Sequence, residues 1–512
     1  MRTGRMQWGV LAALLLATTG PSAGYRVLVL IPLGSRSLYH LSRSLSEALG
    51  DAGHSVTLVS SFEASTHHGN VTEVHTGSDN LVMTDTNIFD IGDKIHLTSN
   101  FIEEATVEIV EGMWTNPAVH QLWERRNDFH AIIITSYINE VAVPFLLGYN
   151  GVYITFVTPG IVFTQIAQQG NILSAAVVPS LMLPFTQHMT FLQRAINPIV
   201  IVYRYVLHSV TVLPRAQKLL EEYFPGMPPL RHLYSNSSLT LINSHFAVDG
   251  PVPLLPTQVE VGTISAKKPR PLPQDLEEFM EGAGENGVIL FSLGSIVKSF
   301  HIPQEYKVML VEAFRQLPQR VVWKYEGDDL HLPPNVLTRK WIPQQDILGH
   351  RRTRVFVSHC GNQGTQEALY HGVPVLAMPI AFDQPRNAAR LANKGYALVL
   401  NWQDLSVDAF LQAINTLIND PSYQEGLRKV SVTLQDQKES AGARAVWWVE
   451  YAIRHKGSPH LLYAGKNLHL FQYLLLDVLL FWLLVLAVLV FLFCYCLTRC
   501  LNCCRRGKAK VE

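Results

Sequence analysis

Short apolar runs that lead through Gly/Ser turns into helical patterns occur in both halves of the chain. In the first half, residues 25–32 are almost continuously apolar, residues 34–37 form such a turn, and residues 55–59 form the next apolar run. In the second half, residues 288–293 lead into Gly294-Ser295. Continuous apolar strands separated by amphipathic helices are typical of parallel sheets covered on both faces. The pattern therefore predicts an α/β fold with two Rossmann-like domains.

A segment without apolar periodicity separates these halves. Residues 263–286 are rich in Lys, Pro, Glu and Gly, which favours a linker. We therefore predict an N-terminal domain at 25–262 and a C-terminal domain at 287–470, facing each other across a cleft. Ligands of open parallel sheets bind beyond the carboxyl ends of the strands, so the Gly/Ser turns are expected to face that cleft.

The N-terminus has the layout of a secretory signal peptide. Arg2 and Arg5 precede an apolar stretch at 8–17, and the small residues 22–24 follow it. The alternative, an uncleaved anchor, is disfavoured because the apolar stretch is about half of the ~20 residues that a bilayer crossing needs. Residues 1–24 are therefore predicted to be removed.

The C-terminus predicts one transmembrane helix. Residues 478–497 contain no charged side chain, and a short basic tail at 498–512 follows them. Positive charge beyond the helix places the tail in the cytosol and the rest of the chain in the lumen, which is a type I topology. Lys508 and Lys510 are spaced like a cytosolic dilysine signal and favour the endoplasmic reticulum membrane. The alternative to the transmembrane helix is a buried core helix. The alternative to the dilysine signal is a solvated basic tail.

Composition excludes some functions and leaves others open. The formal net charge is zero and the basic residues outside the tail are dispersed, so nucleic-acid binding is not expected. Only Cys360, of six cysteines, lies on the luminal side, so a luminal intrachain disulfide is not expected. Asn70 and Asn236 begin possible glycosylation sequons. The apolar stretch at 175–212 is interrupted by polar residues and prolines. It could pack on the membrane surface, around an apolar acceptor, or in an ordinary core.

The residues between 341 and 384 carry the most specific chemical pattern. A strand that ends at Ser358 delivers His359 and Gly361 to the start of a helix that runs through Glu367. Exposed amide donors and the helix dipole make such a place an anion site, and Gly361 and Gly364 allow a diphosphate to approach closely.

Other side chains of this region suit the rest of a nucleotide sugar. Trp341 offers a flat face for a base, Glu367 could bind a ribose hydroxyl pair, and Asp383 and Gln384 could bind sugar hydroxyls. Taken singly, Trp341 could be a core residue, Glu367 a solvated residue on a helix surface, and Asp383 a helix cap. Their common order and spacing favour a nucleotide-sugar site.

The block from Trp341 to Gln384 resembles the nucleotide-sugar signature of the UDP-glycosyltransferase family, which includes the UDP-glucuronosyltransferases. The resemblance extends over nearly the whole mature chain and includes residues 291–295, 419–423, 454–457 and 471–473. It implies a GT-B type fold, a UDP-sugar co-substrate in the C-terminal domain, a small lipophilic acceptor in the N-terminal domain, and no metal or other cofactor.

Motif matching to this family assigns each donor-site residue a role. Ser295, His359, Gly361 and Gly364 would face the diphosphate, Trp341 and Gln344 the uracil, Glu367 the ribose, and Asp383 and Gln384 the sugar. Gln363 stands where many relatives have Asn, which leaves the choice between glucuronosyl and glucosyl transfer open.

The catalytic base of the family is not matched. Transfer to a hydroxyl uses a His oriented by an Asp to take the acceptor proton. Counting back from His54 places Leu38 at the His position, and the strand at 129–135 places Thr135 at the Asp position. His40 is a candidate substitute, although two residues further along a helix it points to a different face.

Two hypotheses follow from this departure. One is a working transferase for acceptors that need little base assistance, such as amines or acidic groups, which predicts turnover of an amine and little turnover of a simple phenol. The other is a catalytically silent UDP-sugar-binding protein that acts as a partner or regulator of related transferases in a homo- or hetero-oligomer. A third hypothesis is a lipid-handling protein that uses only the apolar cleft of the N-terminal domain. It is disfavoured because the donor-site residues would then have no role.

Overall fold

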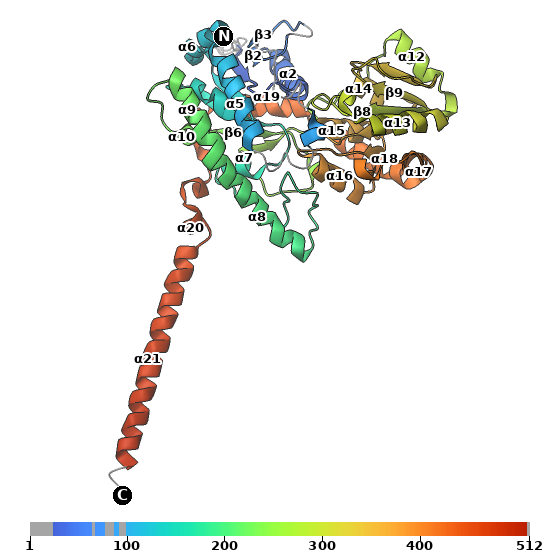
Figure 1. Ribbon diagram of the computed structural model, residues 1–512. Helices are drawn as coiled ribbons and strands as arrows, with labels where there is room; N and C mark the ends of the chain where they lie inside the picture. The colour runs from blue at the N-terminus through green and yellow to red at the C-terminus, as the bar shows by residue number, and fades with distance from the viewer. Residues whose placement is uncertain (1–23, 64–66, 77–86, 92–98, 509–512) are drawn as a thin grey trace, which may run out of the picture.

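The computed structural model describes residues 24–63, 67–76, 87–91 and 99–508. The predicted signal peptide, except Gly24, and Lys510 of the basic tail lie outside these residues. Two sheets, each with its own covering helices, form the body of the molecule, and one long helix projects from it (Figure 1).

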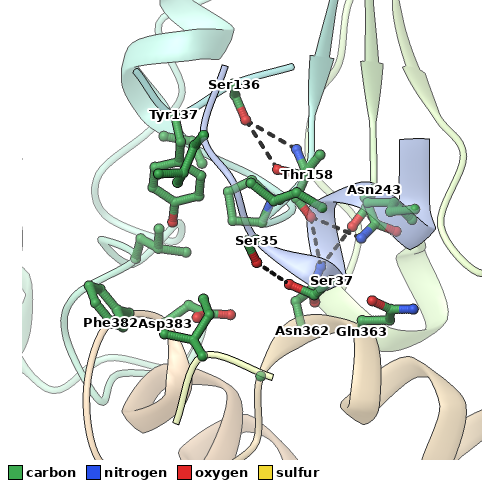
Figure 2. A pocket seen from close by; sticks show the side chains of 18 of the residues that line it. Ser35, Ser37, Ser136, Tyr137, Thr158, Asn243, Asn362, Gln363, Phe382 and Asp383 are labelled. Carbon is green, nitrogen blue, oxygen red and sulfur yellow. Dashed lines mark hydrogen bonds between the residues drawn. The ribbon is translucent and has the colours of Figure 1, made fainter. Parts of the chain in front are cut away.

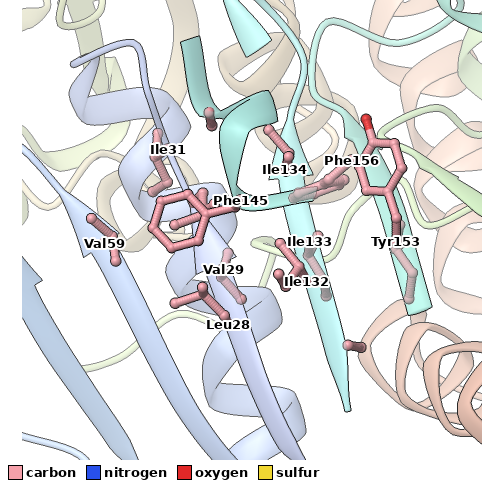
Figure 3. Packing of buried hydrophobic residues seen from close by; sticks show 14 of the residues in the cluster. Leu28, Val29, Ile31, Val59, Ile132, Ile133, Ile134, Phe145, Tyr153 and Phe156 are labelled. Atoms are coloured by element: carbon pink, nitrogen blue, oxygen red, sulfur yellow. The ribbon is translucent and has the colours of Figure 1, made fainter. Parts of the chain in front are cut away.

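The first sheet has seven parallel strands in the order β3-β2-β1-β4-β5-β6-β7. Its strands are β1 (Arg26–Leu30), β2 (Ser55–Ser60), β3 (Val71–His75), β4 (Ala131–Thr135), β5 (Val152–Val157), β6 (Leu239–Ile242) and β7 (Gln258–Glu260). Every residue of β4 and β5 is buried, as expected for central strands covered on both faces. Figure 3 shows the result, with Phe145 and Phe156 packed beside the isoleucines of β4.

The second sheet has six parallel strands in the order β10-β9-β8-β11-β12-β13. Its strands are β8 (Val288–Ser292), β9 (Arg320–Lys324), β10 (Val336–Arg339), β11 (Thr353–Ser358), β12 (Val375–Ala377) and β13 (Ala397–Val399). The prediction of two Rossmann-like domains from the apolar runs is confirmed.

Helices cover the faces of both sheets. In the first half of the chain they are α2 (Arg36–Asp51), α4 (Ile88–Ile91), α5 (Ser99–Trp114), α6 (Pro117–Glu124), α7 (Phe163–Ala167), α8 (Phe191–Leu207), α9 (Leu213–Tyr223), α10 (Leu230–Tyr234) and α11 (Phe246–Asp249). Of these, α4 and α11 pack on the second domain, where Ile88 and Val248 are buried in its core. In the second half they are α12 (Gln274–Glu281), α13 (Gln304–Gln316), α14 (Gln344–Leu348), α15 (Asn362–His371), α16 (Gln384–Asn393), α17 (Val407–Asn419) and α18 (Pro421–Gln435).

The apolar stretch that looked broken in the sequence contains a continuous helical rod. A capping box between Thr190 and Gln193 starts α8, and the π-helical turn η4 (His208–Val212) joins it to α9 without an interruption. Pro198 is accommodated inside α8. The rod is long and apolar enough to count as a candidate membrane span by length and composition alone. Buried Asn197 nevertheless ties it to the domain by donating to the carbonyls of Ala175 and Val178.

After α18 the chain returns to the first domain. Helix α19 (Ala441–Arg454) contacts α2, β5, β6 and β7, and its residues Ala441, Ala445, Val449 and Ala452 are buried in the core of that domain. These residues lie within the range 287–470 that the sequence assigned to the second domain. The difference arises because an apolar periodicity shows which face of a helix is buried but not which sheet buries it.

The chain ends in α20 (Leu470–Tyr473) and α21 (Leu476–Lys508). Helix α21 stands away from both domains (Figure 1), and an 18-residue window within its residues 476–502 has a mean hydropathy of 3.0 with none of the window buried against the protein. The predicted C-terminal apolar helix at 478–497 is therefore confirmed, with slightly wider bounds. An apolar helix of this length without a protein partner indicates membrane anchoring.

Candidate nucleotide-sugar site

A cavity of about 940 Å³ lies between the two domains, at the carboxyl ends of their strands. The structure brings every predicted donor-site residue to its wall, namely Ser295, Trp341, Gln344, His359, Gly361, Gly364, Glu367, Asp383 and Gln384. Leu38 and His40 line it from α2, and Tyr137 and Thr158 line it from the segments after β4 and β5. The cavity thus contains both the predicted donor residues and the apolar surface of the N-terminal domain.

The connection from β11 to α15 forms the polar end of this cavity. The Ser295 Oγ and His359 Nδ1 atoms are buried and have no hydrogen-bond partner among the described residues. Burial, together with the charge of Lys324, lowers the pKa of His359 to about 4, so its imidazole is neutral at physiological pH. These buried polar atoms beside the start of α15 can hydrogen-bond to the oxygen atoms of a ligand.

Two glycines keep space around the His359 ring. Gly294 has a φ of 80°, and a Cβ there would lie 2.6 Å from His359 Cε1. A Cβ on Gly361 would lie 2.7 Å from His359 Nε2. By contrast, a Cβ on Gly364 would meet the Gln344 side chain at an ordinary 3.5 Å. The glycine requirement is therefore strict at Gly294 and Gly361 and weak at Gly364.

Glu367 is the buried carboxyl group of the site. Its Oε2 accepts a hydrogen bond of 2.7 Å from Gln344 Nε2, and its Oε1 accepts one of 3.4 Å from Gln363 Nε2. Burial raises the pKa of Glu367 to about 7, against the effect of the two amide donors, and the charge of Asp346 adds to the rise. The site therefore holds a carboxyl group that changes charge near neutral pH.

Trp341 lies at the mouth of the cavity with 51% of its surface exposed. Its ring is 5.6 Å from the His40 ring, and the guanidinium of Arg36 lies 5.6 Å from the ring centre. Two residues of α2 thus pack against a half-exposed indole, whose remaining aromatic surface is accessible to a ligand.

Asp383 and Gln384 begin α16. Asp383 Oδ2 accepts a hydrogen bond of 2.7 Å from Asn387, and burial raises the Asp383 pKa. Gln384 Oε1 accepts hydrogen bonds from the backbone N–H groups of Ile380 and Ala381, which leaves its amide NH₂ as a donor. Tyr137, from the other domain, directs its hydroxyl toward Phe382 and Asp383 (Figure 2).

Leu38 and Thr135, the two positions that the resemblance assigns to the catalytic pair, lie on neighbouring elements. Leu38 is in the first turn of α2 and lines the cavity, whereas Thr135 ends β4, is fully buried and does not line it. The Thr135 hydroxyl instead donates to the carbonyl of Leu30, at 3.4 Å.

His40 has no carboxylate hydrogen-bonded to it. Its Nε2 is buried without a partner among the described residues. Burial and the charges of Arg36 and Arg43 lower its pKa, although Glu47 opposes them. The ring packs toward Trp341.

Comparison with known proteins agrees with this geometry. The sequence profile of the family described as UDP-glucoronosyl and UDP-glucosyl transferase matches residues 40–511. UDP-glucosyltransferase 2 of Dactylopius coccus is 34% identical over 494 residues, which cover 95% of each chain. UDP-glucuronosyltransferase 2B18 of Macaca fascicularis is 37% identical over 364 residues, which cover 70% of this chain and 67% of that protein.

The chain belongs to the UDP-glycosyltransferase family. The solved structure of TcCGT1 in complex with UDP has a TM-score of 0.56 at 17% identity and covers 85% of this chain and 100% of that chain. At this identity the likeness concerns the fold, and it agrees with two facing parallel sheets of the GT-B type. Members of the family transfer a sugar from a UDP-sugar to an acceptor.

Some residues at the transferase cavity were not found from the sequence. Lys324 ends β9, lines the cavity and pairs with Glu326. Its place at the carboxyl end of a parallel strand was the signal that could have found it. Glu140 and His208 also line the cavity and are hydrogen-bonded to each other, although 68 positions separate them. No local pattern could have found that pair.

The start of α15 also joins the two domains of the transferase. Asn362 Nδ2 donates to the carbonyls of Thr158 and Asn243, at 3.4 and 3.1 Å. Gln366 accepts from the Thr263 N–H at 2.6 Å and donates to the carbonyl of Asn243 at 3.1 Å. These residues fix the helix that carries Glu367 against the strand ends of the first domain, as Figure 2 shows for Asn362 and Asn243.

Proposed function

We propose that this protein transfers a hexosyl group, glucuronosyl or glucosyl, from a UDP-sugar to a small lipophilic acceptor. The observation that supports this most directly is the shared cavity, which joins the donor-site residues of the second domain to the apolar surface of the first. The family membership supports the reaction class but not the choice of sugar or acceptor.

The donor roles proposed for the site follow its geometry. The unpaired Ser295 and His359 atoms, with the N-terminal turn of α15, would bind the diphosphate. Trp341 and Gln344 would bind the uracil, and Glu367 would bind the ribose hydroxyls. Asp383 and Gln384 would bind the sugar through a carboxylate acceptor and an amide donor, respectively.

Acceptor activation is proposed to proceed without the usual His–Asp pair. The acceptor oxygen or nitrogen attacks the anomeric carbon, the bond from that carbon to the diphosphate oxygen breaks, UDP leaves with the electron pair, and the proton of the acceptor passes to solvent. Leu38 cannot take the acceptor proton, and buried Thr135 has no charge to stabilise an imidazolium. Nucleophiles that need little base assistance are therefore the acceptors expected first.

The proposed location is the endoplasmic reticulum membrane with the two domains in the lumen. The partnerless apolar helix α21 supports anchoring, and the positive residues after it support the orientation. Glycans at Asn70 and Asn236 would agree with this orientation, since both residues are exposed.

Product detection by mass spectrometry tests the function. Purified microsomal protein would receive UDP-glucose or UDP-glucuronate with a panel of phenols and amines, beside the double variant Leu38→His/Thr135→Asp. Product from the unaltered protein is the expected result. Product from the double variant alone, together with UDP-dependent thermal stabilisation of both proteins, would instead favour a silent UDP-sugar-binding partner.

A further inference from the structure

Glu140 and His208 form a hydrogen-bonded acid–imidazole pair in the wall of the cavity. His208 Nε2 and Glu140 Oε1 are 2.9 Å apart. The Glu140 side chain is 5% exposed and that of His208 is 37% exposed. Both residues come from the first domain, Glu140 from η3 (Asn139–Leu146) just after β4 and His208 from η4. The motif analysis of the donor site assigns no role to either residue.

The backbone is unusual on both sides of this pair. Tyr137 and Ile138, directly before η3, have φ angles of 73° and 51°, which non-glycine residues rarely adopt. His208 opens a π-helical turn between α8 and α9, a feature that occurs frequently at functional sites. Strained segments of this kind persist only where the surrounding structure determines them. These two segments carry the two residues of the hydrogen-bonded Glu140–His208 pair.

The groups around Glu140 favour its ionised form. Burial alone would raise its pKa, but the hydrogen bond and charge of His208, with the backbone N–H of Glu140, outweigh burial and lower it. The Glu140 charge in turn contributes to the raised pKa values of Tyr153 and Tyr234, which reach about 12 in both cases mainly because of burial. Arg231 is the cation that acts on Tyr234, and its Nη2 also donates to Ser209 in η4.

One nitrogen of the His208 ring remains available to a ligand. With Nε2 hydrogen-bonded to Glu140, Nδ1 is the ring nitrogen left for a ligand. Nδ1 makes no hydrogen bond to any described residue, and His208 lines the cavity. The carboxylate thereby fixes both the orientation of the ring and its tautomer, as in other acid–imidazole pairs.

The pair lines the part of the cavity wall that the first domain supplies, whereas Asp383 comes from the second domain. Tyr137 and Arg204 line the same cavity, and Tyr137 interacts electrostatically with both Asp383 and Arg204. Arg204 precedes His208 by four residues, about 6 Å along the helix axis. An elongated ligand with one end near the donor sugar would direct its other end toward this pair.

We propose that Glu140 and His208 anchor a hydroxyl group at the end of the acceptor opposite to the group that receives the sugar. The preferred acceptor is then an apolar molecule with a nucleophile at one end and a hydroxyl at the other. The hydroxyl donates to His208 Nδ1, while Glu140 holds the ring. This inference rests on the transferase function proposed above, because it specifies the class of acceptor.

Two acceptors that differ only in the distal hydroxyl test the anchor. They are 4-butylaniline and 4-(4-hydroxybutyl)aniline, each titrated by calorimetry into full-length protein in lipid nanodiscs with saturating UDP. We expect the unaltered protein to favour the hydroxylated aniline roughly ten-fold, which is the typical effect of one hydrogen bond to a polarised group. His208→Phe should remove the preference and Glu140→Gln should reduce it. His232→Phe, which changes an exposed His outside the cavity, should leave it unaltered.

The same variants separate anchoring from catalysis. An anchor predicts that His208→Phe removes the KM advantage of the hydroxylated acceptor, so that the KM values of the two acceptors become equal. A loss of kcat with both acceptors would overturn the proposal, because it would make His208 a general base. Equal binding of both acceptors by the unaltered protein would overturn it as well, and so would stronger binding of the matching carboxylate, 4-(4-aminophenyl)butanoate. Because calorimetry needs no turnover, a failure of the transferase function would be recognised separately by the absence of product.

Discussion

The Glu367 carboxyl group accepts a hydrogen bond of 2.7 Å from Gln344, which fixes it at the bottom of the cavity where the ribose is proposed to bind. Gln344 begins α14, and Glu367 lies in the middle of α15. The bond therefore joins two helices of the same domain. The charge of Glu367 can be tested by measuring stability and UDP affinity as a function of pH.

Replacing Glu367 with Gln should remove one component of the pH dependence of stability. The pKa of Glu367 is about 7 in the folded state, above the ordinary value of about 4.5 for an unfolded chain. The folded state therefore holds an extra proton between these pH values, and stability falls as pH rises from about 4.5 to about 7. The expected difference between the protein and Glu367→Gln changes by on the order of 3 kcal/mol across this window.

Urea denaturation at pH 5 and pH 8 would measure this difference. A parallel titration with UDP should show affinity rising with pH through 7, because ribose hydroxyls donate better to the ionised carboxylate. The rise should be absent in Glu367→Gln. An identical pH profile for both proteins would contradict the assignment of a raised pKa to Glu367.

Gly294→Ala should weaken UDP binding by disturbing His359. The new Cβ would lie 2.6 Å from the imidazole, so the ring must move, and the left-handed backbone adds strain of about 1–2 kcal/mol. We expect at least a ten-fold rise in the Kd for UDP, measured by calorimetry. Gly395→Ala is the matched control, since Gly395 has a similar φ of 71° with nothing within 4 Å of the new Cβ. Equal loss of UDP affinity in both variants would refute the steric explanation.

The sequence alone predicted the two sheets and a set of residues that lie together in one cavity wall, because both depend on local pattern. Residues 25–32 and 288–293 became the parallel strands β1 and β8, and their Gly/Ser turns line the cavity as expected. The segment 341–384 also keeps its donor residues close together in the chain. Residues that are near in sequence and follow adjacent strands must meet at one edge of a sheet.

The features that the sequence did not predict all depend on contacts between distant segments. Glu140 meets His208 only because η4 packs beside η3 at the acceptor side of the cavity. Helix α19 has an apolar face that would suit either domain, and the structure assigns it to the first. Neither the periodicity nor the spacing of residues contains that information.

Gln366→Leu should destabilise the contact between the domains. Gln366 is 3% exposed, and its amide pairs with the N–H of Thr263 and the carbonyl of Asn243. Leucine keeps the volume but leaves both backbone groups buried without this partner, which costs about 1–3 kcal/mol. Urea denaturation should show the loss. Gln363→Leu, on the same helix but hydrogen-bonded to Glu367 inside the second domain, should change stability less, and an equal effect of both variants would argue against an interdomain origin.

Helix α19 stabilises the first domain through its buried face. Val449 is fully buried in the core of the first domain, beside Ala445 and Ala452 on the same helix face. Val449→Ala should lower the free energy of unfolding by about 1–3 kcal/mol through lost burial and the cavity left behind. Val432→Ala on α18, where the side chain is 62% exposed, should change it by less than about 0.5 kcal/mol.

The same packing argument extends to the first domain expressed without α19. Removing the helix would expose the faces of α2 and β5 that it covers, and His54 would lose the ion pair with Glu450. Residues 25–262 alone should therefore aggregate, whereas the same segment with residues 441–454 attached through a flexible linker should remain soluble. Size-exclusion chromatography distinguishes the two outcomes. A soluble, cooperatively folding 25–262 fragment would mean that the first domain folds without α19 and does not need it for stability.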